Sequence, residues 1–174
     1  MPHTFDTQLT GAAGEHLVLS RLLQRGLLAA LAPRGTRKAD VLVNFLDDGV
    51  PCLIQVKSRQ FGSDGGWHMS EKLEQVFADD LIYCFVDFEP ESPCVYVIPS
   101  VVVAQVISDD HRLWLATPGR NGQRHNDTSM RRVKRVSLSL GDNWLEQYRE
   151  RWDLISERRS HNAIDHSFGH IPGL

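Results

Sequence analysis

The spacing of apolar residues along the chain predicts a series of helices and strands. Over 7–25 the apolar residues recur at helical spacing, and Gly26 follows as a C-terminal stop. Apolar runs of strand length predict strands at 27–32, 39–46, 51–59, 81–88, 94–98 and 111–117. Further helices are expected at 70–77, 100–107 and 143–155, with a glycine-rich loop at 60–69 and a polar loop at 118–130. This order predicts an α/β (α+β) fold in which a central mixed β-sheet is flanked by helices.

A hairpin between the strands expected at 39–46 and 51–59 brings polar side chains together. The dipeptide Asp48-Gly49 between them is typical of a two-residue hairpin turn. With that turn, Asp40 lies directly opposite Lys57. Residues two apart in a strand point to the same side, so Gln55 joins Asp40 and Lys57 on one face. The pattern therefore predicts a polar cluster on an otherwise apolar sheet.

The side chains of this cluster suit metal-assisted chemistry on phosphate. The Asp40 carboxylate and the Gln55 amide oxygen are hard ligands of the kind that Mg²⁺ prefers. The Lys57 ammonium could orient a water molecule or stabilise the charge on a reacting phosphate, as in metal-assisted phosphodiester hydrolysis. The alternative from spacing alone is an exposed salt bridge between Asp40 and Lys57, worth about 0–1 kcal/mol.

Small residues in the first expected helix surround an acidic one. Residues 11–14 are Gly-Ala-Ala-Gly, and a glycine inside a helix costs about 1 kcal/mol relative to alanine. Such small residues allow the helix to approach a sheet closely, which leaves Glu15 on the packing side. A carboxylate there needs a partner, which a metal ion or Lys57 would supply. The alternative is a Glu15 side chain that faces solvent.

These residues together resemble the PD-(D/E)XK nuclease superfamily, and within it the restriction-endonuclease-like and Holliday-junction-resolvase-like branches. The resemblance rests on Gly14-Glu15 in the first helix, Asp40 at the start of an apolar strand, and Ile54-Gln55-Val56-Lys57-Ser58 in the next strand. It covers roughly residues 8–60. It implies a restriction-endonuclease-like fold, a central mixed sheet flanked by helices, with a site for Mg²⁺ or Mn²⁺ at one end.

The resemblance also assigns roles to individual residues. Asp40 is the central metal-binding acid, Glu15 binds or orients the metal from the helix, and Lys57 is the catalytic lysine. Gln55 takes the place of the usual second acid, which makes the chain a QxK variant, and the backbone carbonyl of Val56 is a further metal ligand. Ala39 stands where the motif has proline. Loss of one negative charge at Gln55 is expected to weaken metal affinity.

The charge distribution permits a surface that binds a polyanion. The net charge is −3, yet residues 111–135 carry seven basic and one acidic side chain, whereas residues 41–110 carry three basic and twelve acidic ones. Contacts to phosphate would position DNA without reading its sequence. The residues expected to make them are Arg34, Arg37, Lys38, Arg59, Arg131 and Arg132.

Length and composition complete the expected picture. The 174 residues, 41% of them hydrophobic, suggest one nuclease-like domain over 1–155 followed by a polar tail over 156–174. The chain shows neither a membrane-spanning apolar run nor a signal peptide, which favours a cytoplasmic protein. Its three cysteines are expected to be small buried residues.

The function expected from these observations is that of a metal-dependent endonuclease hydrolysing DNA phosphodiester bonds. Branched DNA is one candidate substrate, and a homodimer is one candidate assembly. The alternative is a catalytically weak or inactive nuclease-like module that binds nucleic acid or a protein.

Overall fold

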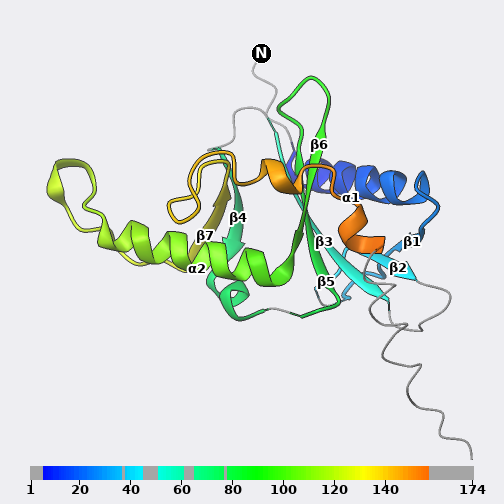
Figure 1. Ribbon diagram of the computed structural model, residues 1–174, viewed down its shortest axis with the longest axis horizontal. Coiled ribbons are helices and arrows are strands. Elements are labelled where there is room, and N and C mark those ends of the chain that lie inside the picture. The colour runs from blue at the N-terminus through cyan, green and yellow to red at the C-terminus, as the bar shows by residue number, and fades with distance from the viewer. Residues whose placement is uncertain (1–5, 37, 45–50, 61–64, 77, 157–174) are drawn as a thin grey trace, which may run out of the picture.

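The computed structural model describes residues 6–36, 38–44, 51–60, 65–76 and 78–156, and its elements largely follow the apolar pattern (Figure 1). The two long helices are α1 (Thr7–Leu23) and α2 (Ser100–Ala116). Short 3₁₀ helices lie at Glu71–Gln75, Arg120–Gly122 and Glu146–Tyr148. The strands are β1 (Leu28–Leu31), β2 (Val41–Asn44), β3 (Cys52–Arg59), β4 (Gly66–Ser70), β5 (Leu81–Asp87), β6 (Cys94–Pro99) and β7 (Met130–Lys134).

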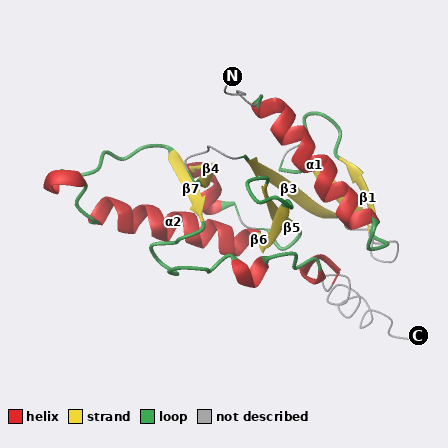
Figure 2. Cartoon of the chain, turned by 90° about the horizontal axis from the view of Figure 1, so that it is seen from above, coloured by secondary structure: helices red, strands yellow, loops and turns green. Residues whose placement is uncertain are grey.

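Five of these strands form the mixed sheet that the sequence predicts. Their order is β1-β2-β3-β5-β6, with β3 and β5 parallel and the other neighbours antiparallel. Strands β4 and β7 pair separately as a two-stranded antiparallel ribbon, called here the β4–β7 ribbon. Helix α1 covers one face of the sheet, and α2 with the β4–β7 ribbon covers the other (Figures 1 and 2).

The two faces of the sheet bury two separate apolar clusters. Ile54 and Val56 of β3 pack with Val18 and Leu22 of α1. Leu53 packs into the other cluster, on the side of α2 and the β4–β7 ribbon. Because neighbouring residues of a strand point to opposite faces, Gln55 and Lys57 share the side of Leu53. The alternation of β3 therefore keeps these two polar residues on one face, as predicted.

Several local predictions are wrong because distant contacts decide them. The expected loop at 60–69 contains β4, where Trp67 is buried and its indole N–H donates to the Val86 carbonyl at 3.0 Å. The partner of β4 is β7, which the sequence pattern did not indicate. The strand expected at 111–117 is instead the continuation of α2, which ends at Ala116.

The helix expected at 143–155 is also not formed as one element. Trp144 belongs to the apolar cluster beneath α2, whereas Trp152 and Ile155 belong to the cluster beneath α1. One straight helix cannot bury side chains on both faces of a sheet. The segment instead follows the edge of β6, where the Glu150 N–H donates to the Val95 carbonyl at 2.8 Å.

The predicted tail and the membrane prediction can be compared with the described residues. Apart from Ser156, the tail expected over 156–174 lies outside the described residues. No helix within the described part of the chain has the length and apolar character required to cross a membrane.

Candidate metal and nucleic-acid site

Asp40 is fixed against β3 by its backbone and its side chain. Its N–H donates to the Ile54 carbonyl at 2.8 Å, and its Oδ2 accepts from the Val56 N–H at 2.7 Å. The N–H of Val56 belongs to the peptide that joins Gln55 to Val56. The Asp40 carboxylate therefore lies beside the segment of β3 that carries both predicted polar residues, Gln55 and Lys57.

The register of the β2–β3 hairpin differs by two residues from the predicted one. Val41 pairs with Ile54 and Val43 with Cys52, so Asp40 lies beside Ile54 and Val56 and not opposite Lys57. The residues of the predicted turn, 45–50, lie outside the described residues. The backbone and side-chain hydrogen bonds of Asp40 to β3 are made in this register. A shift by an even number of residues leaves the predicted face of β3 unchanged.

Helix α1 approaches β3 at Gly14, as the run of small residues predicts. A Cβ atom at Gly14 would lie 1.8 Å from the Ser58 Oγ and 3.5 Å from a methyl carbon of Val56. Real side chains do not come this close, so a larger residue than glycine here would force the Ser58 side chain to shift. The close approach brings the middle of α1, where Glu15 follows Gly14, against β3.

Glu15 lies within electrostatic range of Asp40. Its side chain is half-buried. Burial raises the pKa of Glu15, the negative charge of Asp40 raises it further, and His16 lowers it in part. The carboxylates of Glu15 and Asp40 are therefore near enough to interact electrostatically, although they are far apart in the chain.

The predicted site residues have few partners of their own. Within the described residues, the side chains of Glu15, Gln55 and Lys57 make no hydrogen bond or ion pair. The simple alternative of an Asp40–Lys57 salt bridge is therefore not formed. The half-buried side chains of this group remain able to bind an external ligand.

The residue types of the predicted set are those that bind a divalent cation, although Glu15 lies on α1, which covers one face of the sheet, and Gln55 points to the other face. Two neighbouring carboxylates repel each other, and a cation between them would remove that repulsion. Oxygen donors of Glu15, Asp40 and Gln55 match the preference of Mg²⁺ and Mn²⁺. Within the described residues, however, no group of three or more His, Cys, Asp and Glu side chains is placed to hold a metal. Because Gln55 is neutral, the predicted set carries only the two formal negative charges of Glu15 and Asp40.

Two arginines predicted to contact DNA have structural roles instead. Arg59 is 5% exposed, its guanidinium pairs with Asp87 at 2.8 Å and with Glu89, and it lies over the Trp67 ring. Arg131 is also buried, and it pairs with Glu74. Buried and paired guanidinium groups cannot also neutralise phosphates on the surface.

The other basic residues predicted to contact DNA are placed differently. Arg34 and Lys38 are exposed in the loop that leads into Asp40. Arg132 is half-buried on β7, on the opposite side of that strand from Arg131. Arg37 lies outside the described residues. Arg34 and Lys38 thus remain candidates for phosphate contacts near the acidic pair.

A buried ion network that the sequence did not indicate lies beyond Lys57. Asp87 is fully buried and receives hydrogen bonds from Arg59 and Arg135. Burial alone would raise the pKa of Asp87, but the two arginines outweigh this effect and lower it. The network joins the ends of β3 and β5 to the residue that follows β7. The only sequence signal was the position of Arg59 and Asp87 at the ends of two apolar strands.

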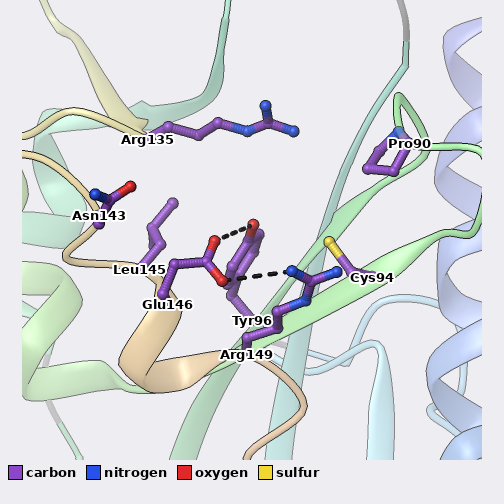
Figure 3. Close-up of a pocket in the computed structure, with 8 residues that line it drawn as sticks. All are labelled: Pro90, Cys94, Tyr96, Arg135, Asn143, Leu145, Glu146 and Arg149. Carbon is purple, nitrogen blue, oxygen red and sulfur yellow. Dashed lines mark hydrogen bonds and ion pairs between the residues drawn. The ribbon is translucent and has the colours of Figure 1, made fainter.

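A small polar pocket of about 240 Å³ lies at the β6 edge of the sheet (Figure 3). Within it, Glu146 accepts a hydrogen bond from the Tyr96 hydroxyl at 3.3 Å and pairs with Arg149 at 3.4 Å. Cys94 also lines the pocket, but burial raises the pKa of its thiol. All three cysteines are free and buried, as predicted, and a thiol with a raised pKa is a poor nucleophile.

Comparisons with known proteins support the fold assignment. Neither a protein family model nor a curated protein matches this chain. Among solved structures, the chain is similar to a bacterial homing endonuclease, I-Ssp6803I, with a TM-score of 0.54 and 18% sequence identity. The match covers 90% of this chain and 97% of the endonuclease chain. At this identity the likeness shows a shared fold, and the chain therefore has a nuclease-like α+β fold with a mixed sheet between helices.

Proposed function

We propose that this protein is a metal-dependent DNA endonuclease of the PD-(D/E)XK type, which hydrolyses phosphodiester bonds. The observation that carries the proposal is the position of Asp40, which accepts a hydrogen bond from the Val56 N–H between Gln55 and Lys57 and interacts electrostatically with Glu15. Residue types and order match the motif of that superfamily, and the fold is shared with a homing endonuclease. A fold alone hosts many functions, so the argument depends on these side chains.

The cation would be held by the carboxylates of Glu15 and Asp40, the amide oxygen of Gln55 and the backbone carbonyl of Val56. When bound, a divalent cation supplies Lewis-acid stabilisation of the charge that develops on the phosphate. Asp40 is preorganised for this role because the Val56 N–H already orients its carboxylate. Glu15 is preorganised by the close packing of α1 at Gly14.

Lys57 would act on the substrate directly. Its ammonium makes no hydrogen bond or ion pair within the described residues, so its donors are available to a phosphate oxygen or to the attacking water. Because the Lys57 ammonium is carried by a strand, its position needs little reorganisation when negative charge develops on the phosphate in the transition state. Arg34 and Lys38 would hold neighbouring phosphates, which positions the DNA without reading its sequence.

The proposal is tested by cleavage of plasmid DNA and of a four-way DNA junction with Mg²⁺ or Mn²⁺. We expect cleavage by the wild type, no cleavage with EDTA, and loss of cleavage in Lys57→Ala with retained DNA binding. Comparison of the two DNA substrates decides whether branched DNA is preferred. Cleavage that survives in Lys57→Ala would contradict the mechanism.

A second candidate is a nuclease-like module that binds nucleic acid or a protein with weak or no catalysis. Gln55 favours it, because the site has one carboxylate fewer than the usual motif. This candidate predicts that DNA is retarded in a gel by the wild type, whereas Mn²⁺ neither binds nor promotes cleavage. Binding of Mn²⁺ that is lost in Asp40→Asn would instead favour the endonuclease.

A further inference from the structure

The segment that follows β7 has an inverted pattern of burial. Val136, Leu138 and Leu140 are each more than half exposed, whereas the intervening Ser137 is 2% exposed. In an isolated soluble chain, the apolar side chains of such an alternation would be expected to face inward. Exposed apolar side chains that gather in one place mark a surface that another molecule covers.

This segment is held firmly in its inverted orientation. The Asp110 carboxylate of α2 accepts hydrogen bonds from the Ser137 Oγ at 2.7 Å, the Ser139 N–H at 2.8 Å and the Ser139 Oγ at 2.7 Å. Ser137 and Gly141 also exchange two backbone hydrogen bonds, at 3.1 and 2.9 Å. The serines therefore face α2, and the exposure of the three apolar side chains is built into the fold.

A groove of about 640 Å³ lies directly beside this segment, where α2 and β7 run side by side (Figures 1 and 2). Ile107 and Trp114 of α2 line it together with Met130 of β7. Lys134 and Leu138 form further parts of its wall. The groove is therefore lined by apolar, basic and acidic side chains, and Val136 and Leu138 of the exposed apolar segment are part of its wall.

We propose that this surface binds a second copy of the same chain in a two-fold symmetric dimer. In such a dimer, the Leu138–Leu140 segment of each copy would enter the groove of the other. A two-fold interface joins one patch to itself, so the patch must carry both the protruding and the receiving part. This surface carries both, within a few residues of each other.

Charge complementarity supports a second copy as the occupant. Asp142 is exposed just beyond the apolar segment, and Lys134 is exposed on the groove wall. Within the described residues, neither side chain has an ion pair. Two-fold docking would place the acidic residue of one copy near the basic residue of the other. A DNA backbone, in contrast, would offer no partner to the exposed leucines.

Sedimentation velocity of the full chain over a wide range of concentrations tests the proposal. We expect a monomer–dimer equilibrium whose dissociation constant rises about 30-fold or more when Leu138→Ser and Leu140→Ser are combined, the effect of losing a central interface contact. The control Leu9→Ser replaces a leucine that is 70% exposed on α1, and it should leave the dissociation constant unchanged. Circular dichroism melting would check that both variants fold.

A charge exchange provides a second, independent measurement. Lys134→Glu and Asp142→Lys should each weaken the dimer, and the double variant should restore it, because the opposite charges again meet between copies. A wild type that is monomeric at every concentration would overturn the proposal. A dimer that tolerates the paired leucine substitutions would also overturn it. Loss of DNA binding in the paired leucine variant of a monomeric protein would show instead that the surface is a nucleic-acid interface.

Discussion

The Asp40 carboxylate, directly before β2, accepts a hydrogen bond from the backbone N–H of Val56 in β3 at 2.7 Å. This contact places a negative charge beside the peptide that links Gln55 to Val56. The pKa of Glu15 is raised by burial and, to a smaller extent, by the negative charge of Asp40. The proposed chemistry depends on this placement, and the following substitutions separate its charge from its structural role.

Replacement of Asp40 distinguishes charge from hydrogen bonding. Asp40→Asn keeps an oxygen that can accept from Val56 but removes the charge, so we expect near wild-type stability and a loss of metal-dependent cleavage of about 100-fold or more. Asp40→Ala also leaves the Val56 N–H without its partner, at a cost of about 1–3 kcal/mol. Cleavage assays and urea unfolding measure the two effects. Unchanged cleavage in Asp40→Asn would remove Asp40 from the mechanism.

Gln55→Glu should strengthen cation binding. The substitution supplies a third carboxylate at the position where the superfamily motif has an acid, and we expect about a tenfold gain in Mn²⁺ affinity. Isothermal titration with Mn²⁺ measures the change. Gln75→Glu, at an exposed position of a 3₁₀ helix, is the matched control and should have no effect. Equal affinities of the two variants would show that Gln55 does not face the cation.

Gly14→Ala should destabilise the protein although alanine favours helices. The new Cβ would lie 1.8 Å from the Ser58 Oγ and 3.1 Å from the Ser58 Cβ, so the serine side chain must rotate and α1 must move slightly from β3, at a cost of about 1–3 kcal/mol in the free energy of unfolding. Gly11→Ala is the control, because a Cβ there meets no atom within 4 Å. Helix propensity predicts that this control gains up to about 1 kcal/mol. Thermal unfolding of both variants decides the matter, and a stabilised Gly14→Ala would refute the close packing.

Asp87→Asn should be among the more damaging isosteric changes in the chain. It leaves the buried Arg59 without its fully buried counter-ion, and breaking a buried pair costs about 3 kcal/mol. Glu89 still pairs with Arg59 and Arg135 and limits the loss. Asp79→Asn, on an exposed side chain, is the matched control and should be close to neutral. Equal unfolding free energies for the two variants would mean that the network contributes little.

The same network predicts a dependence of stability on acid. Burial raises the pKa of Asp87, yet the hydrogen bonds of Arg59 and Arg135 lower it below the ordinary value of 3.8. Its stabilising contribution is therefore complete above that ordinary value and is lost as the pH falls through the lowered pKa. We expect the stability difference between wild type and Asp87→Asn to shrink with falling pH below about 4. Unfolding curves measured over acidic pH check this, and a constant difference would contradict it.

Particular residues show how far the sequence could predict the site. The close approach at Gly14 followed from a run of small residues, and the shared face of Gln55 and Lys57 followed from the two-residue period of a strand. The exact pairing of Asp40 did not follow, because it depends on hydrogen bonds to Ile54 and Val56 that no local pattern reveals. Arg59 has the charge of a DNA ligand, and only its buried partner Asp87 shows that it is structural.

The sequence by itself determined the order of the main elements, the faces of the central strands and the residue types of the candidate site. Those properties depend on local periodicity and composition, which a linear chain contains. The tertiary structure alone decided the pairing of β4 with β7, the division of the segment after Trp144 between two apolar clusters, and the outward orientation of Leu138 and Leu140. These features depend on contacts between residues far apart in the chain, and no local pattern specifies which distant partner will bury a given side chain.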